Sequence, residues 1–190
     1  MVKTIAKVGY AVYDEKTSSY GEVVQLESAE AGGRNFTAEP RGEVTEIYAD
    51  GIVALATDNN DGYDIELELL DIIDDVEKDW YGMSINETTG AKAEFATGAL
   101  MPKFCLMLLE EKIGSYQLTY YPMCQCSKRA SKASKTSEGS FDPQFPTVSI
   151  AARPNDNKLV RYVTNEDKIP DELPVFPANA AANESESTGL

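Results

Sequence analysis

Short runs in which apolar and polar residues alternate constrain this chain more than any other feature. The clearest run, YDIELELL at 63–70, places Ile65, Leu67 and Leu69 on one side of an extended backbone and acidic residues on the other. A period of two is typical of a β-strand with one buried face. KVGYAVYD and FPTVSIAARP show the same alternation. The sequence therefore predicts a mainly β fold.

Two further runs predict an antiparallel hairpin. KFCLMLLEE, at 103–111, is apolar on both faces, and Pro102 before it and IGSY after it favour a strand covered on both sides over a short buried helix. YQLTYYPMCQC, at 116–126, is rich in tyrosine. We expect it to pair with the first run across Gly114.

One segment has helical periodicity. In DIIDDVEKDWYGM, at 71–83, apolar residues share one stripe and most charged residues lie off it. The stripe consists of Ile72, Ile73, Val76 and Trp80. Asp71 is expected to cap the N-terminus, and Gly82 to supply the left-handed residue after the C-terminus. We predict an α-helix over about Asp71–Tyr81 that lies on an open face of the sheet and buries Trp80.

The stretch TDNNDGYD, at 57–64, has some features of a calcium-binding loop. An EF-hand loop needs oxygen ligands at fixed positions and a glycine at the sixth. Placing Gly62 there puts a threonine where the first aspartate is required, and starting at Asp58 loses the glycine bend. The motif fails in both registers. A weak cation site at Asp58, Asp61 and Asp64 stays open as an alternative to a simple turn.

A turn is the favoured interpretation, because GIVALAT and YDIELELL flank the stretch as two strand-like runs. A three-residue loop at 60–62 would set Leu67 opposite Leu55, whereas a two-residue loop would set leucines opposite alanines. Since strand side chains have period two, only the first register brings the large apolar groups together. The sequence predicts a β-hairpin here, with Asp58 facing Asp64.

Three segments lack strand or helix patterns. Residues 127–140 are small, polar and locally basic, and residues 29–43 are a second long connection that contains glycine. Loops of this length in a small β domain are uncommon unless they contact something. Residues 165–190 are acidic and proline-spaced. We predict a domain of residues 1–164 followed by a C-terminal arm, 165–190, that is partly disordered.

Composition disfavours several classes of function. The 32 acidic and 17 basic residues give a formal charge of −15, which disfavours a surface that grips phosphate backbones. The chain has no histidine and no glycine motif for phosphate or for a nucleophile elbow. Its three cysteines, Cys105, Cys124 and Cys126, are predicted to be buried free thiols. We expect no catalytic, cofactor or metal site.

The sequence carries no signal for a membrane. No run of about 18 apolar residues is present to form a transmembrane helix. The first ten residues lack the apolar block of a signal peptide. We expect the chain to fold in the cytoplasm where it is made.

The order and spacing of these segments resemble those of the major tail tube proteins of long-tailed bacteriophages with non-contractile tails. The cues are YAD followed by the NNDGYD turn, the acidic segment that ends in WYG, and the TVSIAARP strand after a loop rich in lysine and serine. The resemblance covers roughly residues 5–164.

The resemblance implies an antiparallel β-sandwich or half-barrel domain with one flanking helix that forms six-membered rings. The rings would stack into a hollow tube around a tape-measure protein, in contact with tail terminator and baseplate or distal tail proteins. Double-stranded DNA would later pass through the lumen. The inner sheets would join into one barrel across subunits, and no enzyme site is expected. The protein would reside in the virion tail after assembly in the host cytoplasm.

A tube that conducts DNA must not retain it, because basic side chains on the lumen would bind phosphates. Acids that alternate along a strand, such as Asp64, Glu66 and Glu68, are what such a wall would use. The competing placement puts all the acids on the outer surface, where they favour solubility.

Three alternatives remain at this stage. The same fold serves inner tubes of phage-derived bacteriocins and secretion needles, which only the neighbouring genes would separate from a virion tail. A second alternative is a monomeric β-sandwich module that binds carbohydrate or an ion at the Asp58–Asp64 region. The third, a hydrolase that uses carboxylates alone, is disfavoured because no partnered acid is evident.

Overall fold

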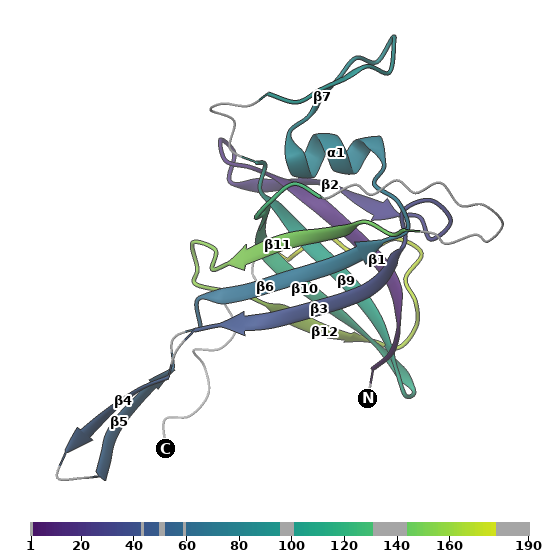
Figure 1. Ribbon diagram of the computed structural model, residues 1–190. Helices are drawn as coiled ribbons and strands as arrows, with labels where there is room; N and C mark the ends of the chain where they lie inside the picture. The colour runs from purple at the N-terminus through teal and green to yellow at the C-terminus, as the bar shows by residue number, and fades with distance from the viewer. Residues whose placement is uncertain are drawn as a thin grey trace.

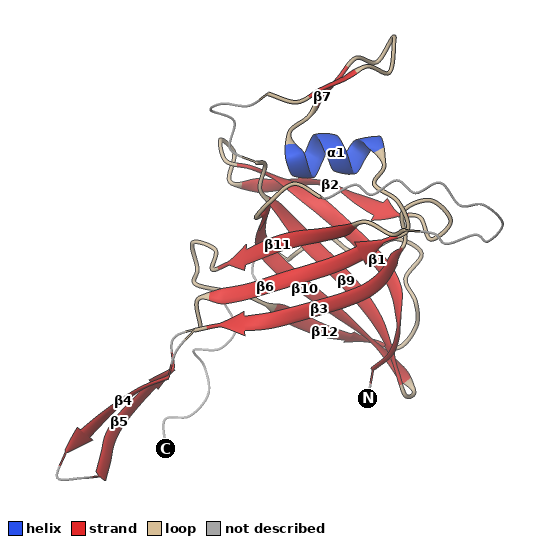
Figure 2. Cartoon of the chain, viewed as in Figure 1, coloured by secondary structure: helices blue, strands red, loops and turns tan. Residues whose placement is uncertain are grey.

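The computed structural model describes residues 2–42, 44–49, 52–58, 60–95, 101–130 and 144–177. Its elements are shown in Figures 1 and 2. In chain order they are β1 (Val2–Asp14), β2 (Ser19–Leu26), β3 (Gly33–Arg41), β4 (Val44–Ala49), β5 (Ile52–Asp58), β6 (Gly62–Leu69), α1 (Asp74–Tyr81), β7 (Ser84–Ile85), β8 (Lys92–Ala93), β9 (Phe104–Lys112), β10 (Ser115–Cys126), β11 (Thr147–Arg153) and β12 (Tyr162–Glu166).

One antiparallel sheet dominates the fold. Its strand order is β2–β1–β9–β10–β11–β6–β3, and β12 and β11 pair with successive halves of β10. The sheet curls until β3 approaches β1, so that a Cβ on Gly33 would lie 2.6 Å from Cγ2 of Val8. Helix α1 lies across one end of the curled sheet (Figure 2). The predicted mainly β, antiparallel half-barrel with one flanking helix is confirmed.

The sheet is packed on both faces. The inner core lies between the curled halves of the sheet and α1, and it includes Tyr10, Ile65, Leu67, Leu69, Trp80, Phe104, Leu106, Leu108 and Ile150. The outer core lies on the opposite face of β1, β9 and β10, and it includes Ala11, Cys105, Met107, Leu109, Leu118, Tyr120, Leu173 and Phe176. Strand β9 supplies alternate residues to both cores. The prediction of a strand covered on both sides is therefore confirmed.

Two further strand predictions are confirmed. Strand β9 pairs with β10 across a turn in which Lys112 faces Ser115, as predicted for a hairpin across Gly114. In β11, Val148 and Ile150 are buried and Thr147 and Ser149 are half-buried, again as predicted.

The predicted hairpin between GIVALAT and YDIELELL is wrong. Strand β5 pairs with β4, whereas β6 lies between β3 and β11. Leu67 faces Phe36 and Val148 instead of Leu55, and Asp58 does not face Asp64. The cause is β3, which occupies much of the segment 29–43 that the sequence predicted as a loop. Its inward Phe36 offers Leu67 a larger apolar partner.

The helix begins later than predicted. Ile73 is the N-cap residue, its backbone is extended with ψ of 164°, and no side chain caps the helix. Asp71 does not cap α1, because its Oδ1 accepts a hydrogen bond of 2.8 Å from the amide of Ile72. Ile72 and Ile73 pack against the inner core from this extended approach. At the other end, Gly82 has φ of 65° and ψ of 31°, as predicted for the left-handed position.

The chain continues on the sheet after Thr164. The boundary predicted there falls inside β12, and Leu173 and Phe176 beyond it belong to the outer core. The remainder of the predicted arm, 178–190, lies outside the described residues. So does most of the predicted basic loop, because the description stops at Ala130 and resumes at Gln144.

Candidate assembly surfaces

The outward face of β3, β6 and β11 is polar and charged. On β6, Asp64 and Glu66 are exposed and Glu68 is half-buried, between buried apolar residues. Arg41 Nε lies 3.3 Å from Asp64 Oδ2, and Arg34 Nη1 lies 3.3 Å from Glu68 Oε1. Within the described part of the chain, Glu66 has no cationic partner. The predicted row of acids on one side of this strand is therefore present.

Two arginines flank Gly62 at one end of this face. Arg41 of β3 is in register with Gly62 of β6, and on the other side a Cβ on Gly62 would lie 3.4 Å from Cα of Arg153 in β11. The alternation of β11 places Arg153 on the outward, half-buried side. These positions are distant in sequence, so no motif indicated that they form a group.

Strand β3 leaves one edge of the sheet without a neighbouring strand. It pairs only with β6 in the described structure. The Arg41 carbonyl accepts a hydrogen bond from Asp61 on the β6 side, and Pro40 has no amide hydrogen to donate. Because successive residues of a strand direct their backbone groups to opposite sides, Phe36 and Ala38 present theirs to the open edge. This edge can accept a further strand.

The β4–β5 hairpin extends from the end of the sheet at which Arg41 and Gly62 lie. Strand β3 ends at Arg41 and β6 begins at Gly62, so the hairpin is inserted between two neighbouring strands. It forms a sheet of its own and projects away from the main sheet (Figure 1). A projection of this kind can reach a second molecule.

The outer core is closed by the C-terminal segment 167–177, here called the strap. Lys7 Nζ donates hydrogen bonds to the carbonyls of Pro170 and Asp171, at 2.9 and 2.7 Å. Leu173 occupies the space above Gly9, where a Cβ would lie 2.7 Å from its Cδ1. The strap therefore covers the outer core on β1, β9 and β10.

Aromatic side chains hold the end of the strap. The ring of Phe176 packs edge-on against Tyr20 and Tyr120, with centroids 5.6 Å apart in both cases, and against Tyr162 at 6.1 Å. The Tyr120 hydroxyl donates a hydrogen bond of 3.1 Å to the Pro174 carbonyl. The spaced prolines of this segment indicated an extended chain, but no periodicity indicated that Phe176 is an anchor.

Helix α1 is fixed to the inner core by Trp80, as predicted. Its ring stacks on Phe104 with centroids 4.7 Å apart and meets Tyr10 edge-on at 5.3 Å. The Tyr10 hydroxyl donates a hydrogen bond of 2.8 Å to Asp79 Oδ2. Burial and this carboxylate raise the pKa of Tyr10. The helix is a packed cover of the inner core.

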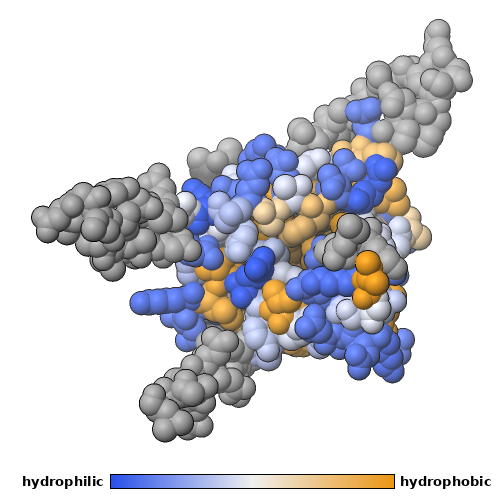
Figure 3. Space-filling view, turned by 90° about the horizontal axis from the view of Figure 1, so that it is seen from below, coloured by the Kyte–Doolittle hydropathy of each residue, from blue (hydrophilic) through white to orange (hydrophobic). Residues whose placement is uncertain are grey.

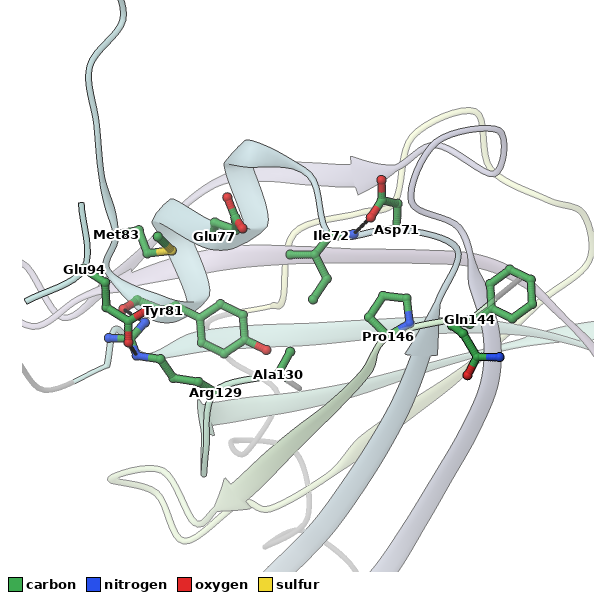
Figure 4. Close-up of a pocket in the computed structure, with 11 residues that line it drawn as sticks. Asp71, Ile72, Glu77, Tyr81, Met83, Glu94, Arg129, Ala130, Gln144 and Pro146 are labelled. Carbon is green, nitrogen blue, oxygen red and sulfur yellow. Dashed lines mark hydrogen bonds and ion pairs between the residues drawn. The ribbon is translucent and has the colours of Figure 1, made fainter. Parts of the chain in front are cut away.

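A cavity of about 430 Å³ lies beside α1. Figure 4 shows the hydroxyl of Tyr81 directed into it and the ion pair of Arg129 with Glu94 at its rim. Ala130 and Gln144, which line the cavity, border the segment 131–143 outside the described residues. The cavity is therefore not assigned to a ligand.

The stretch that suggested calcium binding, 57–64, runs from the end of β5 to the start of β6. Asn60 Oδ1 accepts a hydrogen bond of 3.1 Å from the Gly62 amide, as in an Asx-turn. Asp64 is paired with Arg41, which already neutralises one of the candidate ligands. No group of three or more acidic or cysteine side chains in the described ranges could hold a metal ion. The side chain of Asp58 lies outside the description.

All three cysteines are buried free thiols, as predicted. Burial raises the pKa of each thiol, to about 12 for Cys126. A thiol with a raised pKa is a poor nucleophile and a poor metal ligand at neutral pH. The cysteines therefore act as small core residues.

Exposed apolar side chains are dispersed. In the view from below, separate apolar areas lie among hydrophilic residues (Figure 3). The most exposed large apolar residues in the described ranges are Leu70, Phe95, Ile113, Ile169 and Val175. Single residues of this kind are normal on a protein surface. The candidate contacts with other molecules are therefore the β3 edge, the projecting hairpin and the charged face.

The chain matches no protein-family model, no curated protein and no solved structure. Within the described residues, no helix is long and apolar enough to cross a membrane.

Proposed function

We propose that this protein is the structural subunit of a phage tail tube, which forms stacked six-membered rings and conducts DNA during ejection. The observation that carries the proposal is the open edge of β3 together with the hairpin that projects from the same strand pair. The first supplies a contact to a neighbour in a ring, and the second can reach an adjacent ring. The tape-measure, terminator and distal tail proteins are the partners that follow from such a tube.

Ring formation explains why the β3 edge is left open. An exposed strand edge with free backbone groups promotes uncontrolled pairing with other chains. Closure of sheets from several subunits into one barrel would satisfy these groups and remove the edge. The backbone groups of Phe36 and Ala38 are the ones that such pairing would use.

The outward face of β3, β6 and β11 is the face that we propose for the lumen. It continues from the open edge, and its acids include Glu66, which has no cationic partner in the described structure. Charge repulsion between this face and DNA phosphates is screened over about 8 Å at physiological salt. The repulsion would therefore act only near the wall of the tube, where it would keep DNA from binding.

Electron microscopy of the purified protein tests the proposal. Negatively stained samples at high concentration should show rings or tubes with a central hole, and light scattering should report particles much larger than a 20.8 kDa monomer. A sharp monomer at every concentration and salt condition would contradict the tube and favour the monomeric binding module.

Ala38→Pro tests the role of the edge. Proline removes the Ala38 amide hydrogen, which points away from β6, and leaves the bonds to β6 in place. We expect a folded protein that no longer forms rings. Ala38→Ser keeps the amide and is the matched control. Rings formed equally well by both variants would refute assembly through this edge, provided that circular dichroism shows both to be folded.

A further inference from the structure

The two arginines at the hairpin end of the charged face form a slot. Arg41 and Arg153 stand on the outward sides of the strands on either side of β6, level with Gly62. Two steps between neighbouring strands separate their backbones by about 10 Å. Gly62, between them, is buried and has no side chain. We call Arg41 and Arg153, with Gly62 between them, the arginine slot.

One arginine of the slot lacks a hydrogen-bond acceptor. Nη1 of Arg153 is buried, and no acceptor reaches it in the described structure. Arg41, by contrast, is paired with Asp64. A buried donor without an acceptor is costly, above all on a charged group. Arg153 as a residue is half-buried, so part of it stays at the surface. In a chain with a formal charge of −15, the group that a second copy would bring to that part is most readily a carboxylate.

The opposite end of β6 carries an acidic concavity. It is lined by carboxylates together with Lys92, and the carboxylates are those of Glu30, Asp71, Asp74, Asp75 and Glu77. Lys92 pairs with Asp74 and Glu77. The carboxylates of Glu30, Asp71 and Asp75 make no ion pair among the described residues. This end therefore has an excess of negative charge.

We propose that the arginine slot of one subunit receives carboxylates of the acidic concavity of a second copy. The inference rests on the proposed stacking of rings and specifies its contact. The slot and the concavity lie at opposite ends of one strand, about 23 Å apart for seven residue steps. A contact between two different surfaces at opposite ends is heterologous and repeats along a line. It also gives the stack a direction, because two acidic ends repel each other.

A double and a triple variant of complementary charge test this contact. Arg41→Glu with Arg153→Glu makes both ends acidic, and Glu30→Arg with Asp71→Arg and Asp75→Arg makes both ends basic, because four cations then face Asp74 and Glu77 in the concavity. We expect each variant alone to lose tubes and sedimenting stacks. An equimolar mixture of the two should restore them, because every acidic end then meets a basic one. The control is Lys16→Glu with Lys168→Glu, which changes the charge as much as the first variant at exposed sites outside the slot.

Sedimentation velocity and electron microscopy give the readout, with circular dichroism to establish that each variant is folded. Stacks from the first double variant alone, or a mixture no better assembled than its components, would overturn the contact. If the wild type forms tubes and either of those two results is obtained, the contact is wrong and the proposed tube function stands. Association of the mixture with no ring or tube from the wild type would support the contact and refute the tube function.

Discussion

Trp80→Ala is the sharpest test of the fold. Trp80 is fully buried, stacked on Phe104 with an angle of 5° between the rings, and met edge-on by Tyr10. A buried tryptophan removes about 150–250 Å² from water, which corresponds to about 4–6 kcal/mol at about 25 cal/mol per Å². Alanine keeps part of this stabilisation, and the indole Nε1, which has no hydrogen-bond partner among the described residues, already costs about 1–3 kcal/mol. We expect a net loss of about 3–5 kcal/mol in the free energy of unfolding.

Urea unfolding followed by far-ultraviolet circular dichroism measures this loss, because the substitution removes the only tryptophan of the chain. Trp80→Phe, which keeps a ring on Phe104, should lose clearly less. Ile113→Ala, at a side chain that is 71% exposed, should change stability by less than about 0.5 kcal/mol. A loss below about 1 kcal/mol for Trp80→Ala would refute the packing of α1 on the inner core.

Three further perturbations have defined outcomes. Gly62→Ala should destabilise the protein by about 1–3 kcal/mol in urea unfolding, because φ is 123° and the new Cβ would collide with the Ala152 carbonyl oxygen; a neutral effect would contradict this register. Calcium should bind no tighter than about millimolar in titration calorimetry. Asp64 is already paired with Arg41, and a dissociation constant below about 10 µM would overturn the interpretation of this stretch as a turn. The native thiols should resist a disulfide reagent at pH 8 and react only on unfolding, since burial raises the thiol pKa values; rapid labelling would show that the cysteines are accessible.

The strands that the sequence predicted are those with a local signal. In β6, alternation alone places Leu67 inward and Glu66 outward, whichever strands lie beside it. The choice of neighbours is not local, and here it was predicted wrongly. Strand β3 has only Phe36 and Ala38 as inward apolar residues, and Pro40 weakens its strand signal. Because this segment was predicted as a long loop, the strand that pairs with β6 was missing from the prediction.

The candidate surfaces were less predictable than the strands. Arg41, Gly62 and Arg153 form a group only because β3, β6 and β11 are neighbours, and that order depends on the packing of the whole sheet. Leu173 and Phe176 are anchors because they meet Gly9 and a group of tyrosines, and a proline-spaced segment has no period from which this could be inferred. By contrast, Trp80 was predictable, because the helix stripe directs it to the core.

The acidity of the chain must be compatible with stacking. A ring of six copies would carry six times −15, or −90, and like-charged rings repel one another at distances near the screening length of about 8 Å. In the proposed tube, charge on the lumen face could stay unpaired, because it would face water and DNA. Charge between rings could not stay unpaired, so the contact would need basic groups at one end of each subunit. The arginine slot would supply these groups at the hairpin end, while Glu66 would lie on the proposed lumen face. The same strand would thus serve both requirements, repulsion toward the channel and attraction along the stack.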